Sequence, residues 1–179
     1  MMTLLRIVMC WLAAMFTGGP ADSASTALNA LVAHTETLVV GVAKEMPEEK
    51  FGFAPTAGEF RGVRTFAKQL KHIAAVQYLV ANSILAEPVT ADMTDERGPD
   101  TVRTKDDIVA YVEGSFAALG RAAAATDGTN AFAPIKGVFG SEPATRAGLI
   151  AGVLSHSSDH YGQMVEYLRM NGIIPPASR

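Results

Sequence analysis

The chain consists of long amphipathic stretches separated by polar connections, and after residue 24 no stretch alternates in the manner of a β-strand. Four stretches place apolar residues at the i, i+3, i+4, i+7 spacing that collects them on one helix face. We therefore expect helices over four ranges: about Ser25 to Glu45, about Thr65 to Leu85, Thr104 to Asp127-Gly128, and Ser141–Thr145 to Asn171-Gly172. Four such helices, each of about five turns, predict an all-α fold, a four-helix bundle with long connecting loops.

Residues at the helix ends support these boundaries. Thr65 and Thr104 suit N-cap positions, where a hydroxyl accepts a hydrogen bond from the first turn. The T-x-x-E pattern from Thr56 to Glu59 offers an earlier start for the second helix. Pro143 is expected within the first turn of the fourth helix, where proline is tolerated. The polar segment 87–103, "EPVTADMTDERGPDTVR", is expected to be an exposed connection.

The N-terminal residues differ in character from the rest of the chain. Arg6 precedes an apolar run from Ile7 to Phe16, and a stretch of small residues follows up to Ser25. This order is typical of a secretory signal peptide, and the run is too short to span a bilayer. We expect residues 1–24 to be a signal, cut between Ala21 and Ser25, and 25–179 to be one domain. The mature protein would then be periplasmic or secreted, with no stable membrane anchor; a buried N-terminal helix or a retained anchor is the alternative.

Composition excludes several function classes. Hydrophobic residues make up 49% of the chain, the net charge is −3, and no dense basic cluster is present, which argues against a nucleic-acid partner. The single cysteine, Cys10, lies inside the expected signal. A mature protein without cysteine has no disulfide, no thiolate nucleophile and no zinc site built on cysteine.

Three of the four histidines fall on helix faces that we expect to point inward. His156 and His160 are four residues apart, so both project from one side of the fourth helix. His72 lies in a largely apolar row of the second helix, whereas His34 has no comparable partner. Three neutral imidazoles from two facing helices would suit a divalent transition metal.

The same histidines also have an ordinary interpretation. An H-x-x-x-H pair on a helix is more often a pair of hydrogen-bonded or surface residues, and a single His72 is more often a satisfied core residue. No glutamate follows His156, so the H-E-x-x-H arrangement of metalloproteases is absent. On spacing alone, both interpretations stay open.

Two segments resemble the DinB-like superfamily of metal-binding four-helix bundles: "KQLKHIAAVQYL", 68–79, and "LSHSSDHYGQMVEYLRMNGIIPP", 154–176. The resemblance implies that His72, His156 and His160 hold a divalent transition metal, with zinc or nickel first and iron, cobalt or manganese next. Family members often have a glutamate between the two histidines of the fourth helix. This chain has Ser157, Ser158 and Asp159 there, so an additional carboxylate at the site is not expected.

The resemblance implies two classes of function. One is a metal-dependent enzyme, a hydrolase or transferase acting on a small molecule; relatives include enzymes that transfer low-molecular-weight thiols. The other is a non-catalytic bundle that binds a metal or a small ligand. A haem bundle using Met164 and one histidine is a third alternative, although C-x-x-C-H is absent. Relatives often form homodimers, and no feature of this sequence tests that.

Overall fold

The structure, a computed structural model, describes residues 23–139 and 143–179 and confirms the all-α bundle. Its long helices are α1 (Ser23–Glu45), α2 (Phe66–Leu85), α4 (Lys105–Ala124) and α5 (Arg146–Met170). Shorter elements are η1 (Glu48–Lys50), α3 (Ala91–Thr94) and η2 (Pro176–Ser178), with β1 (Pro134–Ile135) and β2 (Ala144–Thr145). The two strands form an antiparallel ribbon in which Pro134 pairs with Thr145.

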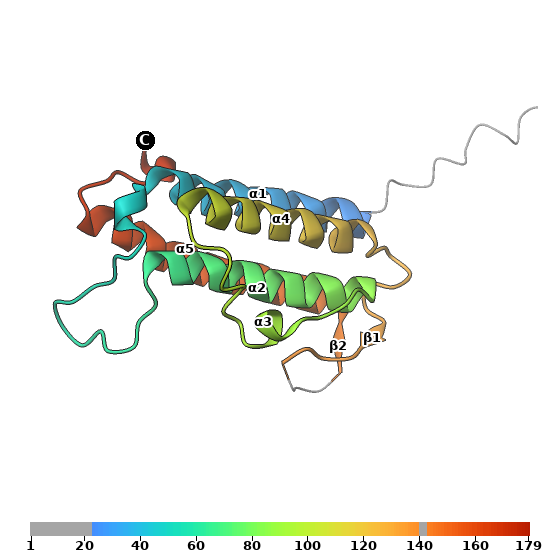
Figure 1. The fold of residues 1–179 in the computed structure, drawn as a ribbon. Helices are drawn as coiled ribbons and strands as arrows, with labels where there is room; N and C mark the ends of the chain where they lie inside the picture. Colours follow the sequence, from blue (N-terminus) through green and yellow to red (C-terminus); the bar gives the residue numbers. More distant parts are fainter. Residues whose placement is uncertain (1–22, 140–142) are drawn as a thin grey trace, which may run out of the picture.

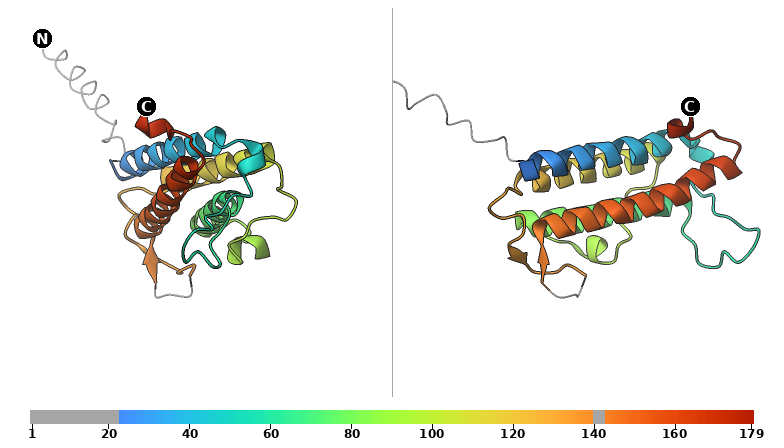
Figure 2. Two further views of the ribbon diagram at one scale, coloured as in Figure 1. Left: turned by 90° about the vertical axis from the view of Figure 1, so that its left-hand side faces the viewer. Right: turned by 180° about the vertical axis from the view of Figure 1, so that it is seen from behind.

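The four long helices form two layers, with α1 beside α4 in one and α2 beside α5 in the other (Figures 1 and 2). Across the layers α2 packs on α4 and α1 packs on α5. The apolar faces meet between the layers, where Phe66, Phe116, Ile150 and Leu168 are almost completely buried. The predicted helix periodicity therefore gives one core, and α2 and α5 are neighbours within one layer.

The direction of each helix determines where its connections must run. Lys105, at the start of α4, donates hydrogen bonds to the carbonyl groups of Lys44 and Met46, at the end of α1. Arg121, near the end of α4, pairs with Glu87, just beyond the end of α2. Helices α2 and α4 thus run in the same direction, and the 86–104 connection must return along the bundle, with α3 lying beside α2 (Figure 1).

The capping residues explain why the helices begin where they do. Thr65 and Thr104 are N-caps as predicted, and the Thr104 hydroxyl forms a capping box with Asp107. Thr145 caps α5 by accepting a hydrogen bond from the amide of Gly148. Pro143 therefore lies before the N-cap, and its expected place in the first turn was wrong.

Other sequence predictions also need correction. Residues Thr56 to Glu59 form no helix, because Gly58 adopts a φ of +105°, which a helix excludes. Helix α4 ends at Ala124, before the predicted Asp127-Gly128. The 87–103 connection contains the short helix α3, and the β1–β2 ribbon was not predicted.

The expected signal peptide falls almost entirely on residues 1–22, which lie outside the described residues. Helix α1 begins at Ser23, within the expected cleavage region. By length and composition α1 could also cross a membrane, yet residues along it pack against α4 and α5. A core helix of a soluble bundle has these same properties, so α1 does not by itself indicate a membrane span.

Candidate metal centre

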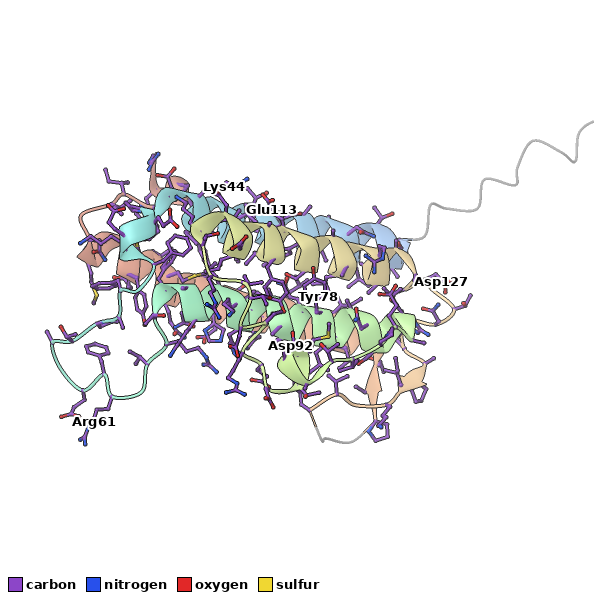
Figure 3. The ribbon with its side chains drawn as sticks, viewed as in Figure 1. Lys44, Arg61, Tyr78, Asp92, Glu113 and Asp127 are labelled. Atoms are coloured by element: carbon purple, nitrogen blue, oxygen red, sulfur yellow. The ribbon has the colours of Figure 1, made fainter. Side chains whose placement is uncertain are left out.

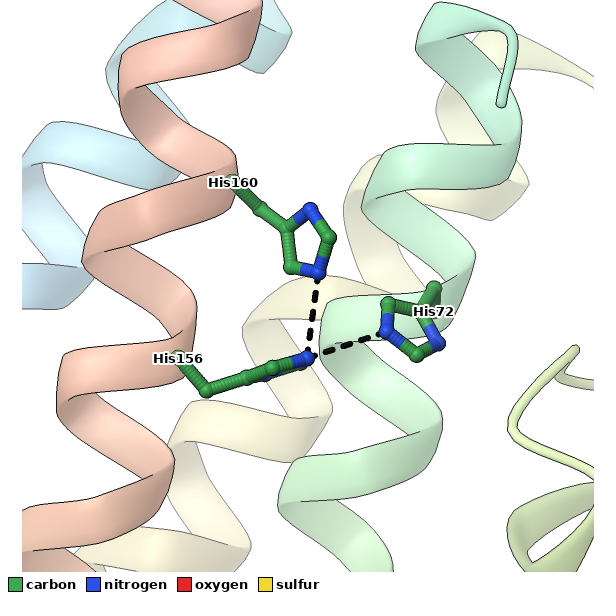
Figure 4. Close-up of side chains that lie close together, drawn as sticks. All are labelled: His72, His156 and His160. Atoms are coloured by element: carbon green, nitrogen blue, oxygen red, sulfur yellow. Dashed lines mark hydrogen bonds between the residues drawn. The ribbon is translucent and has the colours of Figure 1, made fainter. Parts of the chain in front are cut away.

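Helices α2 and α5 bring three imidazole rings together at one point of their interface (Figure 4). Nε2 of His156 lies 3.0 Å from Nε2 of His72 and 3.1 Å from Nε2 of His160. The rings are roughly perpendicular to one another, with centroids 4.5–4.8 Å apart. His72 and His160 are buried and His156 is half-buried, whereas His34 lies exposed on α1. The structure thus brings together the three predicted histidines and leaves out the fourth.

The connection between α2 and α4 fixes the orientation of the His72 ring. Nδ1 of His72 lies 2.9 Å from the carbonyl oxygen of Glu96. A carbonyl can only accept, so Nδ1 carries the proton and Nε2 presents its lone pair to the other two rings. Metal-binding histidines are commonly oriented by such a hydrogen bond on the opposite nitrogen.

The three nitrogens have the spacing that a tetrahedral metal would require. Bonds of about 2.0–2.1 Å to imidazole place tetrahedral ligand nitrogens about 3.3 Å apart. The two closest Nε2 pairs, at 3.0 and 3.1 Å, are within a few tenths of an ångström of that value. Without a cation, one proton on His156 Nε2 would have to serve both neighbours. His72, His156 and His160 could therefore hold a metal ion.

The surroundings of the rings favour the neutral, metal-binding form of each imidazole. Burial lowers the pKa of all three histidines, since a charged ring loses solvation there. The pKa of His160 falls to about 4, first through burial and then through the neighbouring His156 and His72. At neutral pH the site therefore offers three uncharged nitrogens, so no proton has to leave before a cation binds.

Polar side chains pack around the histidines along the same helices. On one side, Gln69 of α2 donates a hydrogen bond to Gln163 of α5, over 2.7 Å. On the core side, Gln77 donates to Ser157 and accepts from Ser115 of α4. The Gln69–Gln163 and Gln77–Ser157 bonds join α2 to α5 on either side of the imidazoles, and the Ser115 bond joins α2 to α4.

A cavity of about 250 Å³ borders the imidazole cluster at His156. The described residues of its lining are four apolar residues, one carboxylic acid and one imidazole: Val76, Phe139, Gly152, Val153, Glu96 and His156. A second hollow of about 320 Å³ lies against β1 and the end of α2 and includes none of the three histidines. Of these two hollows in the described part of the chain, the smaller is the one from which a small molecule could reach the imidazoles.

Sequence reasoning missed Glu96, which contributes a carboxyl group to this cavity. Its carboxylate oxygen lies 3.7 Å from Nδ1 of His72, too far for a hydrogen bond. Asp159, the carboxylate between the two histidines of α5, is exposed, whereas Glu96 comes to the cavity from the connection between α2 and α4. Nothing in the pattern of a polar connection indicates which residue it places over a buried ring.

Comparison with known proteins agrees with the helix arrangement. A family model described as the DinB superfamily matches residues 31–164, a range that includes all three histidines and most of the chain. A search of curated proteins finds no match.

Proposed function

Because the chain belongs to the DinB superfamily and converges three imidazoles beside a cavity, we propose that it is a metal-dependent enzyme acting on a small molecule. His72, His156 and His160 hold the metal, with zinc or nickel the best match to a set of neutral nitrogen ligands. The single observation that supports this most strongly is the His72 ring, which Glu96 fixes with its lone pair directed at the other two.

The reaction we favour is hydrolysis of an ester or amide. When bound, a divalent metal supplies a Lewis acid that polarises a carbonyl group or lowers the pKa of a water molecule. Water adds to the acyl carbon, the bond to the leaving oxygen or nitrogen breaks, and the leaving group takes up the proton. In a thiol transfer, the thiol would take the place of water as the nucleophile: its sulfur bonds to the electrophilic carbon, and the leaving group departs with the thiol proton.

Residues of the cavity have distinct parts in this proposal. Val76, Val153 and Phe139 offer apolar surface that favours a substrate with an apolar portion and excludes water from it. Among the described residues that line the cavity, Glu96 has the one carboxylate, and it is placed to receive a proton. The backbone carbonyl of Glu96 also keeps His72 in one tautomer, so Glu96 contributes to both the metal ligand and the cavity.

Elemental analysis tests the metal site. The purified wild-type protein should contain about one equivalent of a transition metal, and His72→Ala and His160→Ala should each lose it while circular dichroism still shows the helices. His34→Ala, a change on the exposed face of α1, is the matched control and should keep the metal. Retention of metal by either ligand variant would contradict the proposed site.

Turnover separates an enzyme from a binding protein. We expect the metal-loaded protein to cleave an activated aryl ester or an aryl amide, or to join a low-molecular-weight thiol to an electrophile. Each activity should disappear in His160→Ala. Metal binding without turnover on any of these three substrate classes would instead indicate a non-catalytic metal-binding bundle.

We also propose that the protein is exported. Support comes from the apolar run Ile7–Phe16 and the small residues after it. N-terminal sequencing of the protein recovered from the periplasm or medium should find a mature chain that begins between residues 22 and 25. Recovery of the intact chain from the cytoplasm would contradict export and would leave the metal site unaffected.

A further inference from the structure

Three buried polar atoms at the imidazole cluster have no hydrogen-bond partner in the part of the chain that the structure describes: Nδ1 of His156 and two others that complement each other. One is the side-chain oxygen Oε1 of Gln69, and the other is Nδ1 of His160. Gln69 is only 2% exposed, so its oxygen cannot turn to bulk water. A buried acceptor without a donor is destabilising, and such a group usually has a partner in the functional state.

The orientation of the Gln69 amide follows from a chain of hydrogen bonds that begins at Asp159. The Asp159 carboxylate accepts a hydrogen bond from Nε2 of Gln163, over 2.9 Å. Gln163 must therefore turn its oxygen toward Gln69, which donates from its own Nε2. Rotating either amide by 180° would bring two acceptors together. Asp159 thus fixes the direction in which Oε1 of Gln69 points.

The Gln69 oxygen and the His160 nitrogen lie about one helical turn apart along the interface of α2 and α5. Gln69 precedes His72 by three residues on α2, and Gln163 follows His160 by three on α5, so each pair shares a helix face. In Figure 4 the Nδ1 edge of the His160 ring faces away from His156, toward the end of α5 that continues to Gln163. The Nδ1–H donor of His160 therefore faces the part of the α2–α5 interface that contains the Gln69 oxygen.

We propose that Gln69 is a positioning residue of the metal centre, whose Oε1 accepts the hydrogen bond of the His160 Nδ1–H in the metal-loaded protein. This inference rests on the proposed metal site. Binding of a cation at Nε2 leaves the only ring proton of His160 on Nδ1, and an acceptor there orients the ring and makes it a better ligand. Asp159, Gln163 and Gln69 form a relay that keeps this acceptor in place.

Substitutions at residue 69 distinguish an acceptor from a packing residue. Gln69→Leu has similar size and no acceptor, and we expect it to weaken zinc binding about 10- to 100-fold. Gln69→Glu keeps an acceptor oxygen for His160 but loses the donor to Gln163, so it should bind zinc more tightly than Gln69→Leu. A packing role predicts the opposite order, because leucine suits a buried position and glutamate does not.

Zinc affinity is measured by competition with a chromophoric chelator. Gln77→Leu is the matched control: it removes another buried glutamine of α2, and its partners Ser115 and Ser157 keep bonds to backbone carbonyls. This control should lower stability and leave zinc affinity unchanged. Gln163→Leu, at a less buried position, frees the Gln69 amide to rotate and should weaken zinc binding several-fold even if Gln69→Leu folds poorly.

Nuclear magnetic resonance gives a second readout. In the zinc-loaded wild type, the Nδ1 proton of His160 should exchange slowly with solvent, and in Gln69→Leu it should exchange rapidly. Equal zinc affinities in wild type and Gln69→Leu, or equal losses in Gln69→Leu and Gln69→Glu, would overturn the inference alone. Failure of the wild type itself to bind zinc or nickel would overturn the proposed function as well.

Discussion

Glu96 combines two contributions that usually come from separate residues. Its backbone carbonyl holds the His72 ring, and its carboxyl group lines the cavity. Its φ of +57° lies in the left-handed region, which few residues other than glycine adopt. Such strain at a cavity beside three imidazoles is what a site maintained by its surroundings would show.

The left-handed conformation leads to a prediction about substitution at this position. Glu96→Asn should leave stability near the wild-type value, because asparagine tolerates this conformation, and Glu96→Val should cost about 1–2 kcal/mol. Both variants keep the carbonyl that accepts from His72. Urea denaturation measures the difference, and equal stabilities of the two variants would contradict the strained backbone.

The pKa values of the histidines predict how acid affects the metal-free protein. In the unfolded chain a histidine has a pKa near 6.5, whereas that of His160 in the folded protein is about 4. Between these values the unfolded state binds more protons, so stability falls as the pH drops from about 6.5 toward 4. His72 and His156 act in the same direction, since their pKa values are also lowered.

Urea denaturation of the chelator-treated protein at several pH values measures this effect. The slope should reach at most about 1.4 kcal/mol per pH unit for each histidine. His160→Asn, which has no titrating group at this position, should show a shallower dependence between pH 6.5 and 4. Stability that increases on acidification over that range would contradict the burial of neutral rings.

At the scale of helices, the sequence predicted those features that depend only on residues close together in the chain. The helical period identified α1, α2, α4 and α5, and threonines 65 and 104 marked two starts because a cap depends only on neighbouring residues. The four-residue spacing of His156 and His160 also fixed their common face.

Features that depend on distant contacts were not predictable in this way. The apparent capping box at Thr56 fails because Gly58 takes a positive φ of +105°, which the T-x-x-E pattern does not reveal. Leu31 is an apolar residue of α1, yet its side chain is 52% exposed, which periodicity alone does not indicate. Glu96 reaches His72 only because α2 and α4 run in the same direction, which sequence period does not specify.

The close approach of α2 and α4 depends on a glycine. A Cβ atom on Gly114 of α4 would overlap the Tyr78 hydroxyl of α2, which lies where the two helices face each other (Figure 3). Gly114→Ala should therefore destabilise the wild type by about 1–3 kcal/mol. In a Tyr78→Phe background, which lacks the hydroxyl, the same change should be neutral or stabilising by up to about 1 kcal/mol, because alanine favours helix. Thermal denaturation of the four proteins measures the difference, and an equal cost in both backgrounds would contradict this contact.

For the whole molecule, the site and the core are separable sources of stability. The imidazoles join α2 to α5, and the apolar core between the two layers is built from all four long helices. A metal that binds the folded chain alone adds RT ln(1 + [L]/Kd) to the free energy of unfolding. Zinc at 100 times its dissociation constant should therefore stabilise the protein by about 2.7 kcal/mol.

Chelation should remove this increment without unfolding the bundle, since the core does not include the metal. Thermal denaturation is followed by circular dichroism, with zinc and then with EDTA. Each condition should show one cooperative transition, at a clearly higher temperature with zinc, and full helicity at 25 °C. His72→Ala should melt at one temperature whether zinc or EDTA is present, because it lacks a ligand from α2. Loss of helix on chelation would mean that the metal, and not the packing of the four helices, is the main source of stability.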